Sequence, residues 1–100
     1  MGKLTSYLGL AAKSGSVCAG RDSSRRSIYS GKAKLVIVAE DAPEKLREFF
    51  NGLALKEGVP FTVALSKKEL GAAVGKRPCS VLTVCNGEIA RFILERTLVP

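Results

Sequence analysis

The chemistry open to this chain is limited first by the absence of histidine from all 100 residues. Without an imidazole, neither a Ser-His-Asp nor a Cys-His arrangement is available, and no two carboxylates stand at a suggestive spacing. The three cysteines Cys18, Cys79 and Cys85 form no C-x-x-C pair, and a zinc site would need ligands that the sequence lacks. We therefore expect no enzyme, no cofactor and no metal, and we expect the cysteines to be small buried residues in a reducing cytosol.

Residues 15–22 show a superficial likeness to the phosphate-binding motif G-x-x-x-x-G-K-[ST]. Arg21 stands in place of the lysine and Asp22 in place of the magnesium-binding hydroxyl. The segment also follows an expected helix instead of a strand. These departures argue against a nucleotide-binding loop.

Positive charge is the strongest compositional signal, with a net charge of +7. Residues 1–40 contain seven basic and two acidic side chains, and residues 66–78 contain four basic and one acidic. Such clustering favours a basic face that meets a polyanion, although a merely solvated basic surface would have the same composition.

The stretch from Gly20 to Gly31 contains three arginines and four serines, so as a helix it would contribute little to a core. We expect the beginning of this helix to contact RNA. Its first backbone N–H groups can point at a phosphate or a base edge, and Gly20 lets a nucleic-acid backbone approach closely. Arg25 and Arg26 follow one turn later, within reach of flanking phosphates. A polar helix that is only solvated is the alternative.

The turn Gly75-Lys76-Arg77-Pro78 carries the second basic cluster. In an alternating α/β layout, this turn and the start of the second helix can lie at the same end of the sheet. Tyr29 is the only aromatic residue expected nearby, which argues against single-strand binding on a stacking platform. The pattern favours a structured RNA that is recognised by its shape and by splayed loop bases.

The elements that must position these residues alternate along the chain. Apolar runs predict strands at 17–19, 35–39, 61–65 and 81–85. Helical spacing of apolar residues predicts helices between them and at both ends of the chain, with glycine stops at Gly15, Gly31, Gly58 and Gly75. The first helix is expected to bury Leu4, Tyr7, Leu8, Leu10 and Ala11, and the third Leu46, Phe49, Phe50 and Leu53.

Capping residues predict where the helices begin. Asp22 or Ser23 is the expected N-cap of the second helix, and Asp41 that of the third, with Pro43 in its first turn. Ser66-Lys-Lys-Glu69 is a capping box that opens the fourth helix. Asn86 is the expected cap of the last helix.

Strands that alternate with helices indicate an α/β sandwich with helices on both faces of a small mixed sheet. No apolar run approaches the roughly 18 residues that a membrane span needs, and the first residues lack a signal-peptide core. We therefore expect one cytoplasmic domain over residues 1–100.

Several pieces of the sequence resemble the kink-turn-binding ribosomal-protein family, and more closely its small bacterial YlxQ-like members. The pieces are residues 8–15, residues 20–31 followed by 34–41, Val59-Pro60, and residues 66–75. They cover nearly the whole chain in the right order. The resemblance implies a three-layer α/β/α sandwich with a small, mostly four-stranded mixed sheet. It also implies non-catalytic binding of structured RNA, ribosomal or kink-turned, beside ribosomal or translation-associated proteins.

In that family, a Gly-x-Asn-Glu stretch at the start of the second helix enters the kinked major groove, and its Glu reads guanines of sheared G·A pairs. By position, Gly20 and Arg21 match the first two sites. Asp22 stands where the family has Asn, Ser23 where it has Glu, and Arg26 where a lysine meets phosphate. Ser23 lacks the carboxylate for a bidentate contact of a type worth about 1–3 kcal/mol of discrimination.

Two further positions carry over from the family. Lys67 matches a lysine that approaches the RNA, and the loop 75–78 corresponds to one that packs a small apolar residue under a flipped-out base. Lys76 replaces that apolar residue. The resulting candidate RNA-binding residues are Gly20, Arg21, Asp22, Ser23, Arg25, Arg26, Lys67, Gly75, Lys76 and Arg77. The competing hypothesis is an interaction or scaffold module on a ribosome-associated assembly, with its basic face docked on an acidic protein.

Overall fold

The computed structural model of the protein describes residues 2–98, in which five helices alternate with four strands. The helices are α1 (Gly2–Lys13), α2 (Arg21–Tyr29), α3 (Glu44–Glu57), α4 (Lys67–Ala73) and α5 (Gly87–Leu98). The strands are β1 (Val17–Ala19), β2 (Leu35–Val38), β3 (Phe61–Val63) and β4 (Val81–Val84). Each predicted strand is therefore present, with β2, β3 and β4 shorter than predicted.

The strands form one mixed sheet in the order β1-β4-β2-β3. β4 runs antiparallel to both of its neighbours, and Val84 lies opposite Val17 on one side and Leu35 on the other. β2 and β3 are parallel. β2 is a continuous apolar run and β4 is apolar except for Thr83. Both are buried along their whole length, as expected for central strands covered on both faces.

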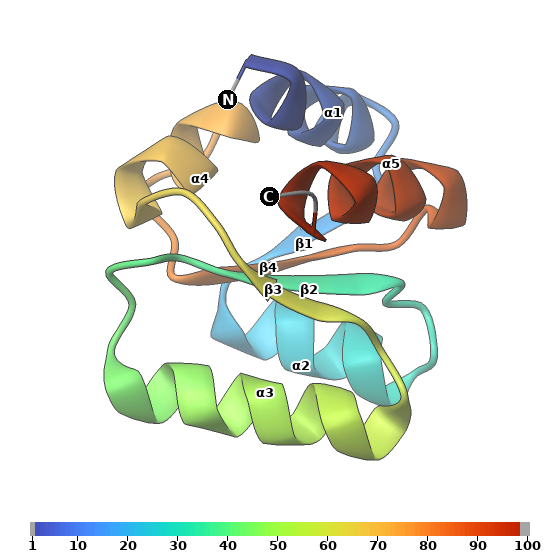
Figure 1. Cartoon of the computed structure of the whole chain (residues 1–100), viewed down its shortest axis with the longest axis vertical. Coiled ribbons are helices and arrows are strands. Elements are labelled where there is room, and N and C mark those ends of the chain that lie inside the picture. The colour runs from blue at the N-terminus through green and yellow to red at the C-terminus, as the bar shows by residue number, and fades with distance from the viewer. Residues whose placement is uncertain (1, 99–100) are drawn as a thin grey trace.

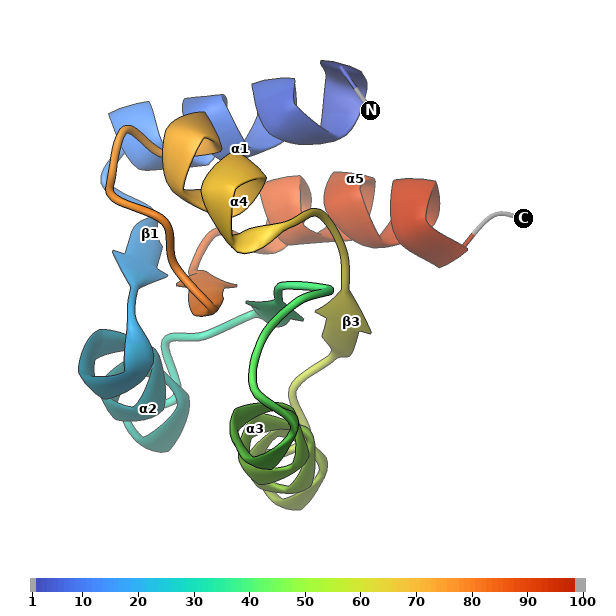
Figure 2. The ribbon, with the colours of Figure 1, turned by 90° about the vertical axis from the view of Figure 1, so that its left-hand side faces the viewer.

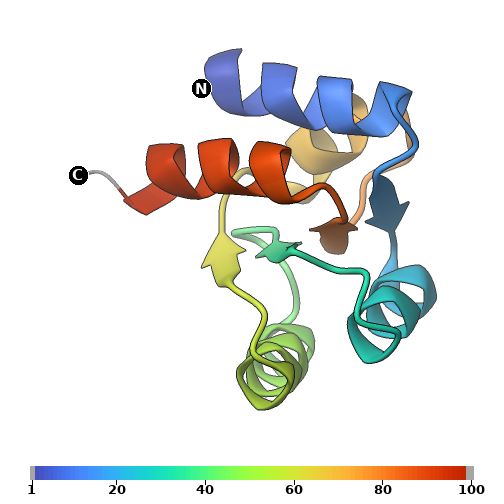
Figure 3. The same cartoon turned by 90° about the vertical axis from the view of Figure 1, so that its right-hand side faces the viewer.

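Helices cover both faces of this sheet, so the predicted three-layer α/β/α sandwich is confirmed (Figures 1 and 3). Successive side chains of a strand point to opposite faces, and β2 divides its residues accordingly. Leu35 and Ile37 join the core beneath α1, α4 and α5, whereas Val36 and Val38 join the core beneath α2 and α3.

α2 packs closely on the sheet although its buried side includes two serines. Ser24, Ser27 and Ile28 are buried. The Ser27 hydroxyl lies 2.7 Å from the Thr83 hydroxyl of β4, and the Ser24 hydroxyl donates to the Cys18 carbonyl at 3.2 Å. These bonds satisfy polar groups that would otherwise be costly to bury.

Two of the predicted helix starts are wrong. Gly20, and neither Asp22 nor Ser23, is the N-cap of α2, and no side chain caps this helix. The N-cap of α3 is Pro43, again without a side-chain bond. The Asp41 carboxylate instead accepts a hydrogen bond from the Lys67 N–H of α4, 26 residues further along the chain, a tertiary contact that a local capping rule cannot anticipate.

The other predicted caps are confirmed. Ser66 and Glu69 form both bonds of the capping box, and Asn86 accepts from the Ile89 N–H at 3.0 Å. Two residues assigned to apolar helix faces are instead exposed, Leu10 by 54% and Phe49 by 48%. Each lies directly beside another residue assigned to the same face, and neighbouring side chains on a helix point about 100° apart.

The loop between α4 and β4 is pressed against α4 at Gly71. A Cβ on Gly71 would overlap the Arg77 carbonyl group and lie 2.9 Å from the Pro78 Cα. The Lys76 N–H also donates to the Gly71 carbonyl at 2.8 Å. Glycine at position 71 thus sets the path of the basic loop 75–78.

Replacing Gly71 by alanine should lower the free energy of unfolding by about 1–3 kcal/mol, because the added methyl group overpacks the contact with the loop. Gly52 is the matched control, since a Cβ there meets nothing within 4 Å. Gly52→Ala should be neutral or should stabilise α3 by up to about 1 kcal/mol. Chemical denaturation measures both, and equal stability of the two variants would contradict the close approach.

Candidate nucleic-acid interface

Four segments that are distant in sequence meet at one edge of the sheet, which we call the loop edge (Figure 2). They are residues 20–21, 41–43, 66–67 and 75–80. Because β4 is antiparallel to both neighbours, the chain leaves β1, β2 and β3 at the same edge where it enters β4. The start of α2 and the basic turn therefore lie at the same edge of the sheet, as expected from the sequence.

Backbone hydrogen bonds join these segments. The Gly20 N–H donates to the Val81 carbonyl at 2.9 Å, which places the start of α2 beside the start of β4. The Cys79 N–H donates to the Lys67 carbonyl at 3.1 Å, and the Lys67 N–H donates to Asp41 Oδ1 at 2.8 Å. The loop edge is a frame of backbone contacts from which the charged side chains project.

The start of α2 presents its backbone outward. Gly20 adopts φ 93° and ψ 167°, a conformation that residues with a Cβ rarely reach. A Cβ at Gly20 would meet nothing within 4 Å, so conformation and not crowding selects glycine. The first N–H groups of a helix have no partner inside the helix, and no side chain caps them in α2. They are donors for an anion or a base edge.

A shallow cavity of about 290 Å³ lies beside this helix start, and we call it the edge hollow. Its lining comes from three of the four segments, from α3 and from β4: Gly20, Arg21, Pro43, Leu46, Pro78, Cys79, Ser80 and Val81. Burial raises the pKa of the Cys79 thiol, which therefore stays uncharged at neutral pH. The edge hollow combines apolar walls with one guanidinium, a surface that suits an aromatic ring attached to a phosphate.

The charged residues of α2 are divided between two sides of the helix. Arg21, Asp22 and Arg25 face α3, where Arg25 Nη2 lies 3.4 Å from Asp22 Oδ1. Ser23 and Arg26 instead line a cavity of about 240 Å³ on the other side of α2, together with Cys18, Ser27, Ser30 and Lys32. The predicted residues of α2 therefore do not form a single surface.

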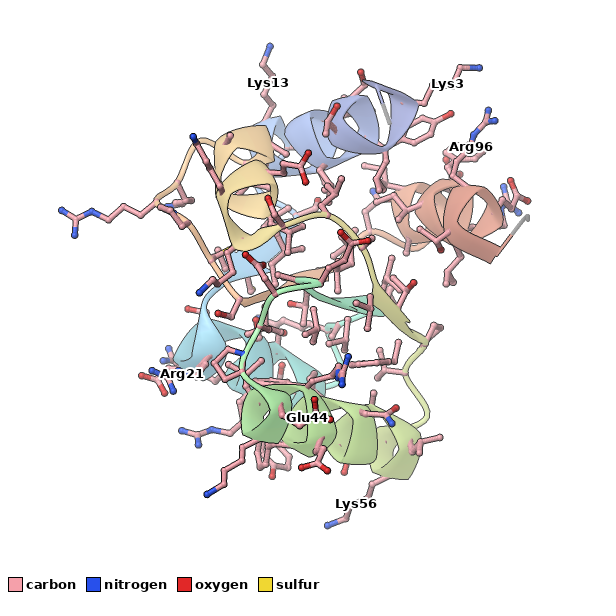
Figure 4. The ribbon with its side chains drawn as sticks, turned by 60° about the vertical axis from the view of Figure 1, so that its left-hand side comes forward. Lys3, Lys13, Arg21, Glu44, Lys56 and Arg96 are labelled. Carbon is pink, nitrogen blue, oxygen red and sulfur yellow. The ribbon has the colours of Figure 1, made fainter. Side chains whose placement is uncertain are left out.

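The basic turn is exposed from Gly75 to Pro78, and Lys67 is half-buried at the junction of two backbone bonds. Pro78 lines the edge hollow with Arg21 (Figure 4 labels Arg21). Lys67 lies beside the same frame through its bonds to Asp41 and Cys79. Tertiary structure thus brings Arg21, Lys67 and the turn to one edge, whereas it places Arg26 around the side of α2.

Sequence reasoning missed the residues that α3 and the preceding loop contribute. Pro43, Leu46 and Phe49 were assigned to a helix start and an apolar stripe, yet they line cavities next to Arg21. For Phe49 a signal existed: Phe49 and Phe50 are adjacent, so both cannot point into one core. For Pro43 and Leu46, nothing in the local pattern indicates that they meet α2.

Within residues 2–98, no group of three or more histidine, cysteine, aspartate and glutamate side chains is arranged to hold a metal ion. No helix among these residues has the length and apolar character needed to cross a bilayer.

These features define a small α/β/α sandwich with donors and cations gathered at one sheet edge. Residues 2–92 match the model of the ribosomal protein L7Ae/L30e/S12e/Gadd45 family, and the chain belongs to this family. The resemblance noted in the sequence is thereby confirmed.

Two relatives of known sequence support this family assignment. The chain is 40% identical over 78 residues to large ribosomal subunit protein eL30 of Pyrobaculum calidifontis, covering 77% of this chain and 76% of that protein. It is 36% identical over 80 residues to large ribosomal subunit protein eL8 of Drosophila melanogaster, covering 76% of this chain. That match spans only 30% of the fly protein.

Two solved structures share the fold. A protein of unknown function from Bacillus halodurans C superposes with a TM-score of 0.91 and 25% identity, covering 95% of this chain and 96% of the other. The 15.5kD RNA binding protein of Giardia lamblia superposes with a TM-score of 0.83 and 25% identity, covering 94% and 83%.

Removing the Asp41 carboxylate should loosen the loop edge. Asp41→Ala leaves the Lys67 N–H without its acceptor and should lower the free energy of unfolding by about 1 kcal/mol. Asp41→Asn retains an oxygen acceptor and should lose less. Asp22→Ala is the control, because its ion pair with Arg25 is exposed and should change stability by less than about 0.5 kcal/mol. Urea unfolding would contradict the bridging role if Asp41→Ala and Asp22→Ala were equally stable.

Proposed function

We propose that this protein binds structured RNA through the loop edge and catalyses no reaction. The observation that carries the proposal is the meeting of the uncapped start of α2 with the exposed basic loop 75–78 around the edge hollow. Membership of a ribosomal-protein family, and a solved neighbour described as an RNA binding protein, support the same function. We also propose a place on ribosomal RNA in the cytoplasm, beside translation-associated proteins, and the chain's similarity to large ribosomal subunit proteins supports this.

Arg21, Lys67, Lys76 and Arg77 have the charge and the placement to neutralise phosphates along this edge. The N–H groups of Arg21, Asp22 and Ser23 supply donors at the helix start. Gly20 and Gly75 leave room for the RNA backbone because neither carries a side chain. Arg25 and Arg26 extend the positive field along both sides of α2.

Asp22 and Ser23 decide which RNA the protein selects. The exposed Asp22 carboxylate lies next to Arg25, which offsets its repulsion of phosphates. Ser23 offers one hydroxyl where a carboxylate would accept two bonds from a guanine edge. We infer that the protein binds kinked or otherwise distorted RNA, with less discrimination for sheared G·A pairs than a glutamate at position 23 would give.

The salt dependence of binding tests the loop edge. A double variant with Arg21→Gln and Arg77→Gln should reduce the slope of log Kd against log salt by about 1–2, since each lost phosphate contact releases about one counterion fewer. Lys56→Gln with Arg96→Gln removes two charges far from this edge (Figure 4) and should leave the slope nearly unchanged. Titration of a kink-turn RNA measures both. A wild-type protein without any salt slope would refute RNA binding, and equal slopes for the two variants would refute the loop edge.

Substituting Ser23 by glutamate tests the selectivity. The Ser23→Glu variant should bind a kink-turn RNA with sheared G·A pairs at least about fivefold more tightly, because a bidentate guanine contact is worth about 1–3 kcal/mol. Binding to a plain duplex should not improve. Ser30→Glu adds the same charge at the other end of α2 and serves as control. Unchanged kink-turn affinity in Ser23→Glu would mean that position 23 does not meet a base.

A further inference from the structure

The groove between α2 and α3 holds an exposed aromatic ring that RNA binding at the loop edge does not require. The groove has a volume of about 590 Å³ and is lined by Arg21, Asp22, Arg25, Pro43, Lys45, Leu46, Phe49 and Phe50. We call it the α2–α3 groove. Phe49 is 48% exposed here, whereas Phe50 is buried beneath α3.

The ring of Phe49 is supported from below. It meets the Phe50 ring edge-on, with centroids 5.1 Å apart and an interplanar angle of 88°. Edge-to-face pairs of this kind are favourable beyond their buried area. Because Phe50 is itself packed in the core with Val36 and Val38, Phe49 rests on a rigid base and presents exposed ring surface to a ligand.

Cations share the groove with this ring. Arg21, Arg25 and Lys45 line the α2–α3 groove, against the single carboxylate of Asp22. That carboxylate lies 3.4 Å from Arg25, so the positive charge exceeds the negative charge along the rim. An aromatic ring among cations matches the chemistry of one nucleotide, whose base stacks on the ring and whose phosphates contact the cations.

The α2–α3 groove adjoins the edge hollow. Arg21, Pro43 and Leu46 line both cavities. A nucleic-acid strand held at the loop edge can therefore pass over Arg21 and enter the groove without leaving the protein surface. The shared lining and the surplus of cations favour RNA over an acidic protein helix, which would find only one exposed aromatic anchor in the groove.

We propose that the α2–α3 groove binds an unpaired nucleotide of the RNA held at the loop edge. The base stacks on Phe49, and the flanking phosphates contact Arg21, Arg25 and Lys45. The inference rests on the proposed function, because the same RNA occupies both places. It adds a stacking site for a single-stranded extension to the recognition of a structured element.

Fluorescence reports this stacking directly because the protein contains no tryptophan. In Phe49→Trp the new indole is the single tryptophan of the chain, and a base that stacks on it should quench its emission. The probe is a kink-turn RNA that ends in a few unpaired adenosines, compared with the same RNA with a blunt end. Quenching should appear with the extended RNA and be weak with the blunt one. Phe92→Trp, on α5 across the sheet, should not be quenched by either RNA.

Affinity provides the second measurement. Phe49→Leu keeps an apolar side chain but removes the aromatic face, and it should weaken binding of the extended RNA about fivefold, at the low end of measured base–aromatic stacking. The blunt RNA should bind Phe49→Leu and the wild type equally. Thermal unfolding of each variant checks that the exposed substitution leaves the fold intact.

The two proposals fail in different ways. If neither RNA binds the wild type in a salt-dependent manner, the proposed function itself is wrong. If both RNAs bind and lose affinity in the Arg21/Arg77 double variant, yet the extension changes neither the Phe49→Trp emission nor the Phe49→Leu affinity, only the stacking site is refuted.

Discussion

The antiparallel pairing of β4 with both β1 and β2 is the constraint on which the remaining structure depends. This pairing sends three strands out of the sheet at the edge where β4 enters it. One hydrogen bond, from the Gly20 N–H to the Val81 carbonyl, then fixes the start of α2 beside the start of β4, shortly after the basic loop. The start of α2 and the basic loop 75–78 are separated by about half of the chain. They lie side by side because one follows β1, the other precedes β4, and these two strands are paired antiparallel.

The polar character of α2 follows from the same strand. A large side chain at position 24 or 27 would hold the helix away from the sheet, whereas serine permits close packing on β4. The Ser27 and Thr83 hydroxyls satisfy each other across this contact at 2.7 Å. Ile28 supplies the apolar anchor. The helix therefore buries one narrow face, and its arginines remain on the two exposed sides.

The segments that carry the basic side chains are held in place mainly by backbone hydrogen bonds. The loop edge is held by main-chain bonds among residues 20, 67, 79 and 81, and the Asp41 carboxylate adds a side-chain bridge to Lys67. The close approach of Gly71 to Arg77 and Pro78 sets the path of the basic loop. Side chains that contact phosphates are consequently free to adjust, while the segments that carry them are fixed.

The sequence by itself determined the helices and strands, the α/β/α architecture and the net positive charge of the protein. The unbroken apolar run 35–39 predicted the strand β2, which is buried along its whole length, and the Ser66–Glu69 capping box formed as predicted. These features depend on residues within one or two helical turns, so a local pattern contains them. The family resemblance extended the prediction to the site residues.

Only the tertiary structure decided which of those residues share a surface. Asp41, which was predicted to cap α3, instead binds the Lys67 N–H of α4. Arg26 lies on the opposite side of α2 from Arg21. Tertiary packing also brings Phe49 of α3 into the groove beside Arg21 and Arg25. The physical reason is that each of these relations depends on how two elements pack across the sheet, which no periodicity within a single element records.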